Sequence, residues 1–168
     1  MSEHARRVLV GGLYAGLVGY VVVVLVLSLM NLATGASPFY TAALFGAVLF
    51  YGLRDPAALE ISAGPVLAYN MLHLLVFLFL GLVSSWLVTK AEEYPAARYA
   101  VLVALIFIAV HMSGALLLFA EPLLAGGAWW QLGAPSLAAS IAMGWYLLWA
   151  HPALRRSLKE IPLGAEED

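Results

Sequence analysis

The chain has 168 residues and a net charge of −2; 64% of its residues are hydrophobic and 11% are charged. A typical soluble domain is roughly 45–50% apolar and about 25% charged, so this composition predicts an integral membrane protein. The low net charge and the lack of a basic patch or nucleic-acid motif exclude nucleic acid as a partner. The sequence contains no cysteine, which excludes disulfides, iron–sulfur clusters and covalent attachment of a c-type haem.

The first long apolar run, residues 8–32, follows a short start that contains Arg6 and Arg7. A bilayer is crossed by about 20 apolar helical residues, so this run is long enough to span it. A cleavable signal peptide has a shorter apolar core followed by a cleavage site with small residues. The run is therefore interpreted as a retained first transmembrane helix.

The next apolar segment, residues 38–53, is too short to be a span. At about 1.5 Å per residue its helix would reach about 24 Å, whereas the hydrocarbon core is about 30 Å thick. Ser37 can cap this helix, and Pro38 suits its first position. Its aromatic side chains favour an interfacial or re-entrant helix on the outer side of the membrane. It could be a simple lid on the bundle, a cover for a ligand or a docking surface for a partner.

Three further runs, residues 65–89, 97–120 and 134–150, complete a predicted bundle of four transmembrane helices. The basic residues decide between four and five spans, because short cytoplasmic loops are enriched in lysine and arginine. With four spans, seven of the eight basic residues lie on the side of the N-terminus, and only Arg54 lies outside. With five spans that ratio would be three to five. The sequence therefore predicts a bacterial-type inner membrane protein with both termini in the cytoplasm, ending in a solvated, partly mobile tail.

Two stripes of small residues predict close helix contacts, because membrane helices associate where small side chains let their backbones approach. The first span carries Gly12, Gly16 and Gly19, and the last carries Ser136, Ser140 and Gly144, with Ala139 beside them. Packing within the bundle is the favoured interpretation of these stripes, and a dimer interface is the alternative.

Two histidines, His73 and His111, lie inside the second and third predicted spans. Ionisable side chains are costly at such depth, so each marks a candidate functional site. Both are roughly 12–14 Å below the predicted outer boundary, from 1.5 Å per helical residue. A short turn joins the two spans, so they are expected to be antiparallel neighbours with the two imidazoles facing each other.

The flanking residues suit a haem between these histidines. Tyr69 and Asn70 share the face of His73, and a glycine near each histidine leaves room for a flat macrocycle. Bis-histidine ligation between neighbouring helices would hold a b-type haem. The predicted cofactor-binding residues are Tyr69, Asn70, His73, Gly81, His111 and Gly114, with His73 and His111 as the metal ligands.

Two other interpretations stay open. The histidines could hold a quinone or a non-haem metal such as copper, with Met71 or Met112 as a further ligand only if the backbone direction allowed it. Alternatively, each imidazole only forms a hydrogen bond across the bundle, in a cofactor-free structural or assembly subunit. His151, next to Pro152 at the cytoplasmic interface, is expected to be exposed.

Catalysis and transport find little support in the sequence. No carboxylate falls inside a predicted span, which argues against a proton-driven transporter. Ser84 and Ser85 have no nearby base that could activate a nucleophile. The sequence therefore predicts a non-catalytic subunit of a bioenergetic, electron-transfer complex, in contact with lipid and with other membrane subunits.

Overall fold

The computed structural model describes residues 2–94, 98, 99, 106 and 129–160. Its elements are α1 (Glu3–Ala33), α2 (Tyr40–Tyr51), the short 3-10 helix η1 (Pro56–Ala58), α3 (Ala63–Glu93), α5 (Trp129–Ala150) and α6 (Pro152–Glu160). The described residues contain no strand. Among them, α1 and α3 are each long and apolar enough to cross a membrane. The all-helical prediction is confirmed, and the structure is compatible with a helical membrane protein. The predicted third span, residues 97–120, lies outside the described residues except at three positions.

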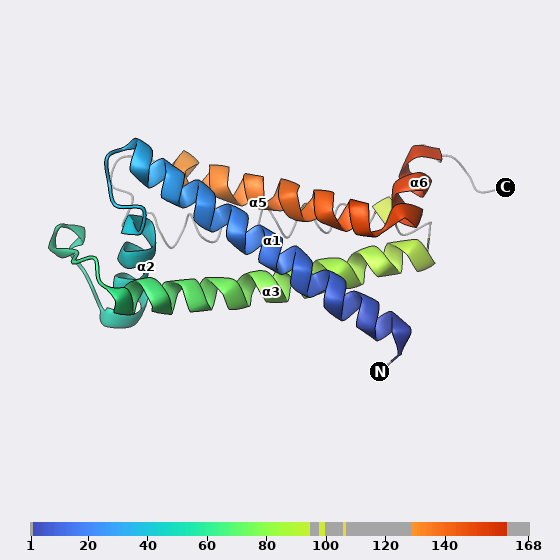
Figure 1. The fold of residues 1–168 in the computed structure, drawn as a ribbon, viewed down its shortest axis with the longest axis horizontal. Coiled ribbons are helices and arrows are strands. Elements are labelled where there is room, and N and C mark those ends of the chain that lie inside the picture. The colour runs from blue at the N-terminus through green and yellow to red at the C-terminus, as the bar shows by residue number, and fades with distance from the viewer. Residues whose placement is uncertain (1, 95–97, 100–105, 107–128, 161–168) are drawn as a thin grey trace.

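The long helices pack around α1 in an antiparallel arrangement. Helix α1 packs against both α3 and α5 and runs in the opposite direction to each of them (Figure 1). The N-terminus, the end of α3 and helix α6 lie at one end of the molecule, while α2 lies at the other (Figure 1). Most described basic residues therefore gather at the end of the molecule that holds the N-terminus, which we call the charged end.

Helix α1 begins earlier than its apolar run because its first turn is capped. The hydroxyl of Ser2 accepts a hydrogen bond from the backbone N–H of Ala5 at 3.2 Å. Glu3 follows in the first turn, where the helix dipole favours a negative charge. These polar contacts extend α1 by five residues beyond the predicted start at residue 8.

Glycines set the contact between α1 and α3, as the stripe on the first helix predicts. A Cβ atom at Gly16 would collide with the carbonyl oxygen of Phe77, and one at Gly81 would collide with that of Gly12. The two backbones therefore touch where no side chain intervenes. The prediction of close contacts for Gly12 and Gly16 is confirmed.

The small-residue stripe of α5 behaves differently. Ser140 is exposed, its hydroxyl donates to the carbonyl of Ser136 at 2.8 Å, and no described atom lies within 4 Å of a Cβ built at Gly144. The buried face of α5 carries Ala139, which the sequence predicts beside the stripe, together with Met143 and Leu147. The prediction of a close contact at Ser140 is wrong, because Met143 and Leu147 supply most of the packing on this face.

Gly19 shows how α1 receives one of these side chains. A Cβ there would lie 2.5 Å from the sulfur of Met143. The glycine thus leaves the space that the flexible thioether fills.

Helix α2 closes the end of the molecule opposite to the charged end. It begins at Tyr40 with Phe39 as its N-cap, so the expected cap at Ser37 and first position at Pro38 are wrong; the Ser37 hydroxyl accepts a hydrogen bond from the N–H of Phe39 at 3.3 Å, before the helix begins. It ends at Tyr51, and the φ of 70° at the C-cap Gly52 is left-handed and suits glycine. The side chain of Asn31 links α1 to α2. Its Nδ2 donates a hydrogen bond to the carbonyl of Pro38 at 3.2 Å, and its Oδ1 accepts one from the Thr41 hydroxyl at 2.9 Å.

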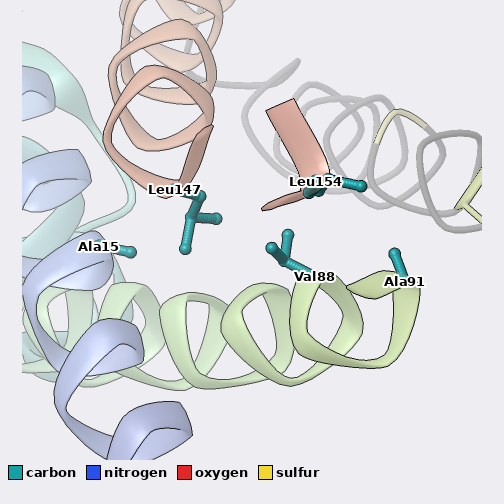
Figure 2. Close-up of a cluster of buried hydrophobic side chains, with 5 residues drawn as sticks. All are labelled: Ala15, Val88, Ala91, Leu147 and Leu154. Atoms are coloured by element: carbon teal, nitrogen blue, oxygen red, sulfur yellow. The ribbon is translucent and has the colours of Figure 1, made fainter. Parts of the chain in front are cut away.

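Four helices meet in a small apolar cluster near the charged end. The cluster contains Ala15 from α1, Val88 and Ala91 from α3, Leu147 from α5 and Leu154 from α6 (Figure 2). Leu154 is only 1% exposed, so it anchors α6 against the bundle. Helix α6 thus occupies the start of the segment that the sequence predicts to be a solvated tail.

Candidate functional site

His73 lies within a column of aromatic rings. The rings of Tyr69 and Phe77, four residues before and after it on α3, have centroids 5.0 Å and 5.1 Å from that of His73. Residues spaced by four lie on one helix face, so the helical repeat itself builds this part of the column. On α2, Phe45 stacks on Tyr69 with a centroid distance of 5.6 Å. We call Phe45, Tyr69, His73 and Phe77 the aromatic column.

The imidazole of His73 has an unsatisfied nitrogen. Its Nε2 atom is buried and has no hydrogen-bond partner among the described residues. A buried polar atom without a partner costs roughly 1–3 kcal/mol by mutational data. The nearest ring on α1, that of Tyr20, has its centroid 6.5 Å away. The buried Nε2 atom of His73 therefore lacks a hydrogen-bond partner among the described residues.

Asn70, in contrast, is satisfied within the bundle. Its Oδ1 accepts a hydrogen bond from the hydroxyl of Tyr20 at 3.0 Å, and its Nδ2 donates to the carbonyl of Val66 at 2.8 Å. The amide thus links α1 to α3. The structure gives this predicted cofactor residue a role in holding the two helices together.

The remaining predicted site residues divide in two groups. The space beside Gly81 holds the backbone of α1. His111 and Gly114 lie outside the described residues, as does the separation between the two histidines. The structure therefore brings together His73 and Tyr69, and the assignment of the full set to a cofactor stays a prediction.

A second polar site, at the charged end, is formed by His151 and Glu92. The Nδ1 atom of His151 lies 3.1 Å from Glu92 Oε2, and the two side chains are 2% and 14% exposed. The N–H of Leu154 also donates to Glu92 Oε1 at 3.5 Å, in the first turn of α6. Glu92 thereby caps α6 from another helix, at the end where the dipole favours an anion.

The expectation that His151 is exposed is wrong. Helix α6 folds onto α3 through Leu154, and this encloses the residue that precedes the helix. The sequence does contain a signal for this arrangement. Pro152 suits the first position of a new helix, and Leu154 and Leu158 repeat at the spacing of one helix face.

Other contacts at the charged end complete the docking of α6. The buried Arg98 donates a hydrogen bond from Nη1 to the hydroxyl of Ser157, in α6, at 2.8 Å.

On the surface, Glu93 pairs with Lys90 at 2.5 Å and with His4 at 3.1 Å. Within the described residues, no three histidine or acidic side chains come together in a way that could hold a metal ion. His73 and the His151–Glu92 pair are thus separate sites.

The fold and these sites define a helical chain with two helices fit to cross a membrane. Comparison with protein-family models, with curated proteins and with solved structures gives no match.

Proposed function

We propose that this chain is a small, non-catalytic subunit of a bioenergetic membrane complex and binds haem b through His73 and His111. The observation that carries the proposal is the buried Nε2 of His73, which has no partner among the described residues. A bond from this nitrogen to iron would remove the cost of leaving it unpaired in an apolar environment.

The aromatic side chains around His73 are chemically suited to a haem. The aromatic column supplies apolar surface on both sides of the imidazole along α3. Its rings would exclude water and hold the His73 ring in one orientation. When bound, haem supplies reversible one-electron transfer; the chain contributes the ligand nitrogen and a low-dielectric shell.

We further propose four spans in a bacterial-type inner membrane, with both termini in the cytoplasm and α2 on the outer side. The start of α1, the end of α3 and helix α6 lie at one end of the molecule (Figure 1), and these segments contain Arg6, Arg7, Lys90 and the cations of α6, which supports this orientation. The absence of cysteine from the sequence makes the test clean. Single cysteines introduced at Asp55 and Ser157 should react with an impermeant thiol reagent from opposite sides of the membrane.

The competing candidate is a cofactor-free structural or assembly subunit. One observation favours it, because the space that the sequence assigns to a macrocycle beside Gly81 is filled by α1. In that case the imidazole of His73 would only form a hydrogen bond across the bundle.

An absorption spectrum separates the two candidates. We expect the full chain, purified with haem supplied during expression, to show a reducible Soret band. His73→Ala should abolish the band, and the matched control His4→Ala, at a side chain that is 45% exposed, should retain it. A chain that binds no haem, or an unchanged spectrum in His73→Ala, would favour the scaffold.

A further inference from the structure

An apolar groove lies between α1 and α5. It is lined by Val18 from α1 and by Ile141, Ala142, Trp145, Tyr146 and Trp149 from α5, and its volume is about 700 Å³. Two of the side chains that line it are large and exposed: Trp145 is 77% exposed and Trp149 is 69% exposed.

Helix α6 follows the groove-lining part of α5 in the sequence and exposes positive charge. Trp149, the last residue of the lining, precedes α6 by three positions. One face of α6 is buried through Leu154, and the other exposes Arg155, Arg156 and Lys159. Neither Arg155 nor Arg156 forms an ion pair with a described residue.

We propose that the groove and α6 together bind one anionic glycerophospholipid, with its acyl chains against Trp145 and Trp149 and its phosphate at Arg155 and Arg156. Tryptophan is enriched at the level of lipid headgroups, where an apolar ring can also meet water. Guanidinium groups match phosphate oxygens in bidentate geometry. The site thus combines an apolar wall with a cationic end, which is the pattern of an anionic lipid.

Charge complementarity selects this occupant. A zwitterionic lipid brings its own cation to the arginines, whereas phosphatidylglycerol brings only negative charge. A transmembrane helix of another protein would cover the tryptophans but would leave Arg155 and Arg156 without a counter-charge. The inference goes beyond the proposed function and does not depend on His73.

Native mass spectrometry of the full chain in neutral detergent tests the headgroup. We expect phosphatidylglycerol to bind at least about tenfold more tightly than phosphatidylcholine. Each cation near a membrane surface is worth about fivefold in affinity, so Arg155→Gln with Arg156→Gln should weaken phosphatidylglycerol binding about 25-fold. The matched control, Arg6→Gln with Arg7→Gln, removes the same charge at the same end from α1 and should change binding less than about twofold.

The groove is tested by filling it. Ala142→Trp should weaken the binding of phosphatidylglycerol, while Leu75→Trp, on the exposed face of α3, should not. If Ala142→Trp fails to fold, Trp145→Ala removes a wall and should have the same effect on lipid binding. Equal affinity for the two lipids, or equal losses in the two arginine pairs, would overturn the proposal. So would groove variants that change the oligomeric state and leave lipid binding intact, because a second copy would then occupy the groove.

Discussion

His73 and His151 are both histidines, but only His151 has a polar partner among the described residues. His151 is almost fully enclosed and meets the carboxylate of Glu92 at 3.1 Å. His73 stands among aromatic rings with a buried nitrogen that meets no described partner. An enclosed imidazole with a partner from its own chain is explained by the fold. An imidazole without a partner among the described residues is a candidate ligand, and this contrast separates His73 from His151.

The largest expected effect tests the structural histidine. Glu92→Ala should lower the free energy of unfolding by about 3 kcal/mol, because it leaves His151 enclosed without its partner. It also removes the cap of α6. The matched control is Glu93→Ala, whose pairs with Lys90 and His4 are on the surface, where solvent screens them, so the loss should be small. Chemical unfolding in detergent measures both, and equal small losses would show that the His151–Glu92 pair does not hold α6.

The second prediction concerns the contact of α1 with α3, the helix that carries His73. Gly16→Val should destabilise the protein by about 2 kcal/mol or more, because the added atoms meet the backbone of α3 beside Phe77. Gly144→Val makes the same change where no described atom lies within 4 Å, and should have little effect. Thermal unfolding compares the two variants. Similar losses in both would mean that the α1–α3 contact tolerates separation.

The sequence predicted features that depend on local pattern. Helix length identified α1 and α3, glycine spacing identified the face of α1 that makes a close contact, and the short apolar run identified α2. It could not place His151, because the partner Glu92 lies 59 positions away and is met only once α6 folds back. Nor could it choose the packing face of α5, where small residues and larger apolar residues offer two competing stripes. That choice depends on which side chains fit the surface of α1, as Met143 fits Gly19.

A smaller effect concerns the polar link beside His73. Tyr20→Phe removes the hydroxyl that donates to Asn70 and should cost about 1 kcal/mol, the net value of a typical hydrogen bond. The control Tyr14→Phe removes a hydroxyl from a side chain that is 57% exposed, and should cost less. Unfolding free energies that are equal for both variants would mean that Asn70 is satisfied without Tyr20.

The smallest expected change in stability belongs to His73. Replacing an unpartnered polar group by an apolar one of similar shape is close to neutral, or stabilising. His73→Phe should therefore alter the unfolding free energy of the haem-free chain by less than about 1 kcal/mol, because it keeps a ring at the same place in the aromatic column. His151→Phe should be costly, because it leaves the Glu92 carboxylate without its partner. A loss of more than about 2 kcal/mol in His73→Phe would mean that the imidazole already has a partner within the chain. A neutral or stabilising His73→Phe that also loses the Soret band would show that the imidazole does not stabilise the fold, and that the ligand accounts for its presence.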